Sequence, residues 1–159
     1  MRSLVLTLFS FLLLSLATTQ AQDAKYKCLL QTTNYKGLEA YIVVSLINPA
    51  GQYEKTLYVM GSDKQWYNGF KEWHKQQSKK KENLSAITGA SVAAGDRSST
   101  TFVLDESKLN KGYKLRFESS VEDQNYHVTD VEIPLTTEAL TLKTDGKGYI
   151  RFVKLSKVQ

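Results

Sequence analysis

A repeated alternation of apolar and polar residues is the feature of this sequence that most restricts its fold. Between Lys25 and Leu155, short runs in which every second residue is apolar are separated by turn-forming residues at regular spacing. A period of two places alternate side chains on opposite faces of a β-strand, and turns at such intervals are typical of antiparallel sandwiches. The sequence therefore predicts an all-β, Ig-like antiparallel sandwich of about seven or eight strands.

Individual strands can be placed along the chain. Residues 38–47 give the strongest signal, since their β-branched and aromatic side chains predict a central strand buried on both faces. The turn at residues 48–51 leads into a returning strand at 53–60. An interruption of the alternation near Thr129 and Asp130 predicts a bulge. The remaining expected strands are 25–33, 100–104, 113–118, 126–133, a short one at 140–142, and 149–155.

The first residues predict an export signal. Arg2 precedes a nearly unbroken apolar run over residues 4–16, and small residues up to Ala21 suit a signal peptidase, so we expect cleavage after Ala21. The run is too short for a transmembrane helix, and no later segment could span a bilayer. Residues 22–159 then form one domain, in which 20 basic and 16 acidic residues remain once Arg2 is removed, a net charge of +4. We expect a monomer with no nucleic-acid partner.

Residues 65–95 interrupt the strand pattern and contain both tryptophans, Trp66 and Trp73. Phe70 and Trp73 share one face of residues 69–80, which predicts a short amphipathic helix packed on the sheet. Its lysines crowd the C-terminal end, where they suit the helix dipole. We interpret them as a solvated helix end, with a patch for an anionic partner as the alternative. Residues 83–99 have no period and predict a long loop, a type of segment that often carries function.

The aromatic cluster of Trp66, Tyr67, Phe70 and Trp73 has two interpretations. The rings can fasten the helix to the sheet, since each buries a large apolar area. They can instead form the wall of a groove for a planar ligand or a sugar. Their helical spacing favours packing.

Residue types used in catalysis and metal binding are present without the motifs that would organise them. There is no nucleophile elbow and no Cys/His signature, so we do not expect an enzyme. His74 and His127 lack metal-site spacing. With Met60 they could ligate haem or copper, but we interpret both as surface residues and expect no metal. Cys28 has no partner for an internal disulfide and predicts a buried, inert thiol.

The segment Thr88-Gly89-Ala90-Ser91 is the one chemical motif. Small residues permit close approach of another molecule, and Gly89 permits a tight turn that presents Ser91. The segment resembles the acceptor motif at which a periplasmic FMN transferase esterifies flavin phosphate to Thr or Ser. Ser91 replaces the usual Thr, and Ser85 stands where that motif has Asp. The resemblance implies covalent FMN at Ser91, within a loop that includes Thr88 and Gly89, and with Trp66 or Trp73 near the isoalloxazine ring.

Seven segments taken in order carry a wider resemblance: residues 40–44, 48–51, 55–59, 64–67, 70–73, 86–91 and 111–115. Together they resemble domain-of-unknown-function family 2271, a family of exported bacterial proteins. Its members look like a single Ig-like sandwich akin to that of the flagellar hook-capping protein. They tend to occur beside membrane proteins with PepSY domains, iron-uptake receptors and FMN transferases. The resemblance implies a periplasmic accessory role in redox chemistry or metal acquisition, and it supplies no activity.

The leading hypothesis is a non-enzymatic accessory or carrier protein of an envelope redox or iron-uptake system, with FMN on Ser91 as its sharper form. Its partner would be a membrane-embedded PepSY-type protein or an uptake receptor. One alternative is an interaction module that docks its lysine-rich helix and loop on a membrane partner. Another is a small-ligand binder that uses the aromatic cluster.

Overall fold

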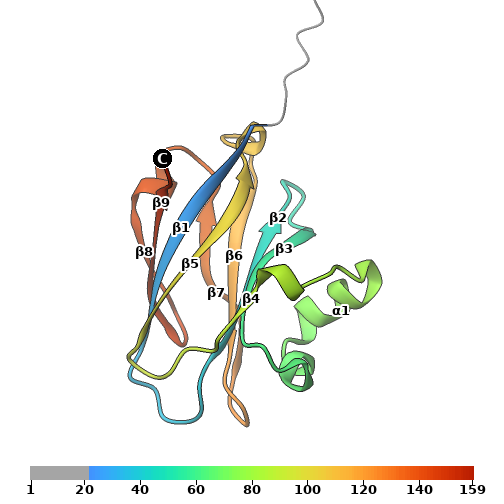
Figure 1. The fold of residues 1–159 in the computed structure, drawn as a ribbon, viewed down its shortest axis with the longest axis vertical. Coiled ribbons are helices and arrows are strands. Elements are labelled where there is room, and N and C mark those ends of the chain that lie inside the picture. The colour runs from blue at the N-terminus through green and yellow to red at the C-terminus, as the bar shows by residue number, and fades with distance from the viewer. Residues whose placement is uncertain (1–21) are drawn as a thin grey trace, which may run out of the picture.

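The computed structural model describes residues 22–159, which form two β-sheets packed face to face (Figure 1). The strands are β1 (Asp23–Thr32), β2 (Tyr41–Ile47), β3 (Tyr53–Met60), β4 (Thr88–Gly89), β5 (Arg97–Asp105), β6 (Lys114–Ser120), β7 (Tyr126–Pro134), β8 (Lys143–Asp145) and β9 (Ile150–Lys157). One sheet has the strand order β5-β1-β9-β8 and the other β4-β3-β2-β6-β7. The predicted all-β sandwich is confirmed. The predicted export signal and its cleavage site lie outside the described residues.

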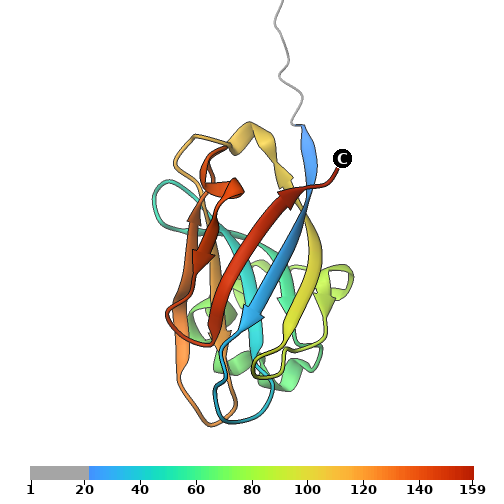
Figure 2. The same cartoon turned by 90° about the vertical axis from the view of Figure 1, so that its left-hand side faces the viewer.

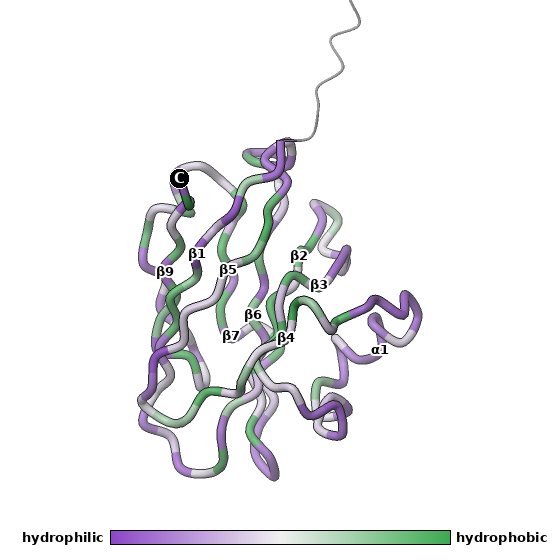
Figure 3. Tube along the Cα trace, in the orientation of Figure 1, coloured by the Kyte–Doolittle hydropathy of each residue, from purple (hydrophilic) through white to green (hydrophobic). Residues whose placement is uncertain are grey.

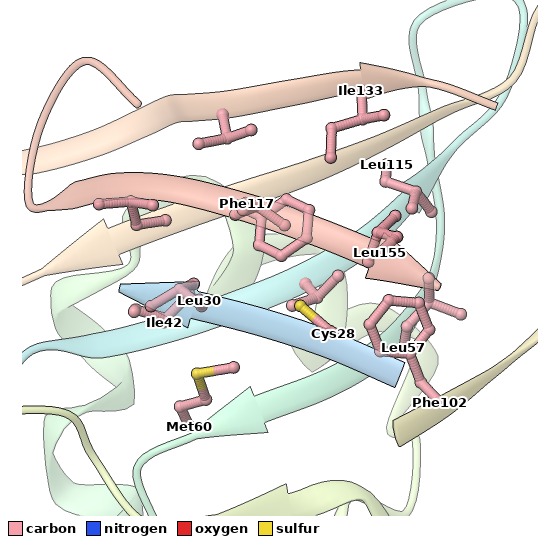
Figure 4. Close-up of a cluster of buried hydrophobic side chains, with 14 of the residues drawn as sticks. Cys28, Leu30, Ile42, Leu57, Met60, Phe102, Leu115, Phe117, Ile133 and Leu155 are labelled. Atoms are coloured by element: carbon pink, nitrogen blue, oxygen red, sulfur yellow. The ribbon is translucent and has the colours of Figure 1, made fainter. Parts of the chain in front are cut away.

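The main core fills the space between the two sheets. In β1, Tyr26, Cys28 and Leu30 are buried and alternate with more exposed residues, as the sequence predicts. Figure 4 shows side chains of both sheets gathered in this core, among them Cys28 and Leu30 of β1 and Leu115 and Phe117 of the opposite sheet. The period-two pattern arises because each strand turns one row of apolar side chains toward the other sheet, as expected for a sandwich.

The outer face of the five-stranded sheet carries a helical cover. The 3-10 helix η1 (Lys64–Gly69) and the helix α1 (Lys71–Lys80) pack there over a second apolar cluster. Figure 2, in which the four-stranded sheet faces the viewer, shows these helices behind the other sheet. The cover explains why β2 is buried on both faces. The helix predicted at residues 69–80 is confirmed as α1, which begins at Lys71. Gly69, the first predicted residue, belongs instead to η1.

Strand count and direction differ from the prediction in the segment expected to be a long loop. Within residues 22–159 there are nine strands, and β4 lies inside the predicted loop, where it pairs parallel to β3. Residues 85–87 form a further 3-10 helix, η2 (Ser85–Ile87). Two-residue strands leave no period to detect, which is why the sequence pattern did not reveal β4.

The short strand predicted at residues 140–142 is wrong. A 3-10 helix, η4 (Ala139–Thr141), occupies this position, and β8 follows it. Leu140 is buried, whereas Leu142 is 55% exposed. A strand would place both leucines on the same face, so the tighter turn is the geometry that buries one of them and leaves the other in water.

The predicted bulge near Thr129 and Asp130 is confirmed. Phe117 of β6 pairs with Val131 of β7, but Ser119, two residues on, pairs with His127, so β7 contains two additional residues. Extra residues in one strand of a pair re-aim the side chains around them. Here Asp130 becomes buried at the edge of the core.

Candidate functional site

A cavity of about 880 Å³ lies where η1 meets the β6–β7 turn and the segment that precedes β2. Its walls come from residues near positions 38–41, 66–71, 91 and 120–126, which the fold brings together from distant parts of the chain. Small-molecule sites are concave spaces of roughly 300–1,000 Å³. The cavity is therefore large enough for a cofactor or another ligand of similar size.

Aromatic side chains form one part of this cavity, namely Tyr41, Trp66, Phe70 and Tyr126. Phe70 packs edge-on against Tyr126, with ring centroids 5.4 Å apart. Trp66 is 38% exposed, which is unusual for a tryptophan. Exposed aromatic surface at a concave site is suited to a planar ring.

The charged residues of the cavity are mainly acidic. Glu39, Glu122 and Asp123 line it together with one cationic side chain, that of Lys71. The Ser91 hydroxyl lies at this cavity and donates a hydrogen bond to the carboxylate of Glu39. The lining thus combines a hydroxyl nucleophile, a carboxylate in contact with it, and aromatic rings.

A buried carboxyl group contacts one of the aromatic residues of the cavity. Glu118 in β6 is only 2% exposed and accepts a hydrogen bond from the Tyr126 hydroxyl. Burial raises the pKa of Glu118 to about 7, although the hydrogen bond from Tyr126, the nearby charge of Arg116 and the backbone N–H of Trp73 act in the opposite direction. Glu118 faces the backbone N–H of Trp73 in the first turn of α1, a helix whose N-cap residue Phe70 makes no side-chain cap hydrogen bond.

Two of the predicted site residues, Ser91 and Trp66, lie at this cavity. They belong to different segments, and the fold places both at the same concave surface. The sequence motif and the exposed tryptophan thus converge at one place.

Thr88 and Gly89 do not line the cavity and have structural roles. The Thr88 hydroxyl donates to the backbone carbonyl of Leu84, at 2.7 Å. Gly89 lies in β4, so the predicted tight turn at this glycine is wrong. A Cβ at Gly89 would lie 2.4 Å from the Tyr58 hydroxyl oxygen. The glycine is needed for close packing against Tyr58 and not for a left-handed backbone.

Trp73 is a core residue and does not line the cavity. It is 1% exposed, and its indole nitrogen donates to the Thr56 hydroxyl at 2.9 Å. Its ring packs edge-on against Tyr67 and Phe70, with centroid distances of 5.2 and 6.0 Å. Of the two tryptophans predicted near a flavin ring, the structure therefore brings only Trp66 to the site. The packing interpretation of the cluster holds for Tyr67, Phe70 and Trp73.

Among the cavity residues that sequence reasoning missed are Glu39, Tyr41 and Tyr126. The sequence pattern places Tyr41 in a strand buried on both faces, yet Tyr41 lies half-buried on the outer face of β2. Glu39 precedes the strand and has no motif around it. No local pattern marks these residues, because their proximity arises from sheet pairing.

The other candidate residues show no such convergence. His74 is exposed, whereas His127 is half-buried against the Tyr149 ring, at 5.0 Å between centroids, and so does not point freely into solvent as expected. Cys28 is buried, and burial raises the pKa of its thiol to about 12, as expected of an inert cysteine.

Within residues 22–159, no group of three or more His, Cys, Asp and Glu side chains is arranged to hold a metal ion. In the same range, no helix is both long enough and apolar enough to cross a membrane.

Comparison with known proteins gives one result. No curated protein and no solved structure matches the chain, so the likeness to the flagellar hook-capping domain stays a prediction. A family described as "Predicted periplasmic protein (DUF2271)" matches residues 23–152, which is most of the chain. This agrees with the segments singled out from the sequence and with the export signal expected before them. The chain therefore belongs to the DUF2271 family of periplasmic proteins.

Proposed function

We propose that this periplasmic protein is a non-enzymatic carrier of FMN, esterified to Ser91, in an envelope redox or iron-uptake system. The observation that carries the proposal is the convergence of Ser91 and Trp66 on one cavity of about 880 Å³. A flavin linked through its phosphate needs a hydroxyl at the rim and a flat apolar surface within reach for the isoalloxazine ring. The cavity offers both.

The charges of the cavity favour an ester-linked flavin over a freely bound one. Free FMN has a phosphate dianion, which would face the carboxylates of Glu39, Glu122 and Asp123 with only Lys71 to balance them. A phosphodiester at Ser91 has one negative charge, and the covalent bond retains the flavin without any need for a cationic pocket. The charges of the cavity lining therefore fit a covalently attached FMN better than free FMN.

Thr88 is the other hydroxyl of the motif and is a poor acceptor. Its hydroxyl already donates to the Leu84 carbonyl within the turn that leads to β4. Ser91 follows that strand and lines the cavity, where its oxygen can be approached. The geometry supports Ser91 as the site of attachment.

The partner would be a membrane-embedded PepSY-type protein or an uptake receptor. Figure 3 shows α1 as one of the most hydrophilic segments of the chain. Lys71, Lys75 and Lys79 are exposed at a spacing of four residues, so they share one face of α1. Within residues 22–159, none of the observed salt bridges involves a lysine of α1. A cationic face whose lysines form no salt bridge within the described residues supports the second candidate function, a module that docks this helix on an anionic region of a membrane partner.

A third candidate is a non-covalent binder of a planar ligand or a sugar. The exposed Trp66 and the half-buried Tyr41 and Tyr126 favour it, because they offer flat surfaces without requiring a covalent bond. This function uses the same cavity as the flavin carrier. The two functions differ in one measurable way, because only the flavin carrier gains mass that survives denaturation.

The test is the intact mass of the protein after co-expression with an FMN transferase in the periplasm. We expect a gain equal to one esterified FMN and a yellow protein. Ser91→Ala should abolish the gain, and Thr88→Ala should retain it if the protein folds. Ser99→Ala, an exposed serine in β5 of the other sheet, is the matched control and should be modified like the wild type.

The outcomes separate the three candidates. An unmodified mass in the wild type contradicts the flavin carrier. Retained absorbance of a small ligand after purification, lost on denaturation, would then indicate the non-covalent binder. An unmodified and colourless protein would leave the interaction module.

A further inference from the structure

We propose that Glu39 is the group that receives the proton of Ser91 when Ser91 is modified. The inference rests on the proposed function, since it concerns how the same site becomes loaded. It assigns a chemical role to a residue that belongs to no motif in the sequence. The role follows from the contact between the two side chains and from the way the backbone fixes them.

A single backbone bridge holds Glu39 and Ser91 together. The Ala40 N–H donates to the Val92 carbonyl at 2.8 Å, and the Val92 N–H donates to the Ala40 carbonyl at 3.0 Å. Glu39 and Ser91 each precede one partner of this antiparallel bridge, so their side chains lie on the same face as diagonal neighbours. A glutamate is long enough to span that diagonal, and its carboxylate accepts the Ser91 hydrogen bond.

Tyr35 fixes the bridge from the side. Its hydroxyl accepts a hydrogen bond from the Ala40 N–H at 2.7 Å and donates one to the Val92 carbonyl at 3.0 Å. The Tyr35 ring in turn packs edge-on against Tyr149, at 5.0 Å between centroids. One side chain thus links both strands of the bridge and anchors them to the sandwich. The backbone that carries Glu39 and Ser91 is therefore held in place by hydrogen bonds, although both side chains are accessible at the cavity.

The reaction can be written with all atoms placed. FAD, held by the FMN transferase, is the donor. The Ser91 oxygen forms a bond to the phosphorus of the FMN half, and the bond from this phosphorus to the bridging oxygen of the pyrophosphate breaks. AMP leaves with that electron pair, and the Ser91 proton passes to the Glu39 carboxylate, which already accepts it in a hydrogen bond. No atom changes its oxidation state.

The same transfer resolves an electrostatic conflict in the product. A charged Glu39 beside a charged phosphodiester would repel it, because both lie at the mouth of one cavity. During the transfer, the Glu39 side chain that takes up the proton can donate it in a hydrogen bond to the new phosphodiester. Lys71, the cationic residue of the lining, remains available to balance the ester charge.

The experiment measures the initial rate of FMN transfer from FAD to the purified chain by the transferase, followed by intact mass. Glu39→Gln keeps a hydrogen-bond acceptor for Ser91 but cannot take up its proton, so the rate should fall about a hundredfold or more. Glu138→Gln removes an exposed carboxylate that does not line the cavity, and it should react at the wild-type rate. Glu39 is exposed, so the variant should keep the wild-type melting temperature.

The pH profile distinguishes proton transfer from simple positioning. The wild-type rate should decline as the pH is lowered, and Glu39→Gln should lack this decline relative to Glu138→Gln. A Glu39→Gln chain that reacts at the wild-type rate, or slowly with an unchanged profile, overturns the role of Glu39 alone. A wild-type chain that gains no mass overturns the proposed function and the role of Glu39 together.

Discussion

The side chain of Asp130, in β7 of the five-stranded sheet, accepts a hydrogen bond from the backbone N–H of Ile150, in β9 of the four-stranded sheet, at 2.9 Å. The same carboxylate accepts hydrogen bonds from the N–H groups of Lys147 and Gly148, at 2.8 and 2.7 Å, and from the Ser119 hydroxyl. A single side chain therefore closes the β8–β9 turn and ties it to the opposite sheet. The bulge in β7 is what directs this carboxylate inward.

Asp130→Ala should be strongly destabilising. Asp130 is 1% exposed, and its removal takes the acceptor from the buried Ile150 N–H and Ser119 hydroxyl and from the part-buried N–H of Gly148. Each such group costs about 1–3 kcal/mol, so the free energy of unfolding should fall by at least about 3 kcal/mol. Urea denaturation followed by circular dichroism measures this. Asp145→Ala, at an exposed residue of the same hairpin, is the control and should change stability by under about 1 kcal/mol. Similar losses for both variants would contradict the role of Asp130.

The two tryptophans should respond in opposite ways to truncation. Trp73→Ala removes a buried ring that packs against Tyr67 and Phe70, and it should lower the free energy of unfolding by about 3–5 kcal/mol. Trp66→Ala removes a 38% exposed ring at the cavity and should cost about 1 kcal/mol or less. Thermal unfolding of the two variants compares them directly. An equal loss in both would mean that Trp66 is part of the core and is not free to contact a ligand.

Gly89→Ala should be destabilising because of Tyr58. The added methyl group would lie 2.4 Å from the Tyr58 hydroxyl oxygen, which forces the ring or β4 to shift. We expect a loss of about 1–3 kcal/mol. Tyr58→Phe removes the oxygen and leaves ring carbon Cζ, 3.3 Å from the added methyl group, as the nearest atom, so it should recover part of the loss in the double variant. If the two substitutions are strictly additive in urea denaturation, close packing is not the reason for glycine at this position.

The strands of this protein could be predicted because their signal is local. In β1, the alternation of Tyr26, Cys28 and Leu30 with polar residues depends on a backbone period that any short window reveals. The bulge at Asp130 was visible for the same reason, as a local change of phase. The position of β4 was not, because two residues have no measurable period.

The different environments of Trp66, at the cavity, and Trp73, in the core, could not be predicted from their spacing in the sequence. A continuous helix would place both on about the same face. The chain instead leaves helical geometry at Phe70, with φ −86° and ψ 67°, between η1 and α1. The two tryptophans are thereby separated, one toward the cavity and one into the core. The proximity of Glu39 to Ser91 was hidden for a different reason, since it depends on the distant Ala40–Val92 bridge.

The pH dependence of stability should carry a signature of Glu118. Burial raises the pKa of this carboxyl from its ordinary 4.5 to about 7, so between these values the folded state holds a proton that the unfolded state has lost. Stability from this group is therefore fully present below about pH 4.5 and decreases as the pH rises toward 7, by up to about 3 kcal/mol. Glu118→Gln keeps an acceptor for Tyr126 without titrating, so its stability relative to the wild type should increase over this window. Urea denaturation at pH 4.5, 6 and 8 measures the difference, with the exposed Glu138→Gln as control. A difference between Glu118→Gln and wild type that stays constant across these pH values would show that Glu118 ionises in the fold as it does in water.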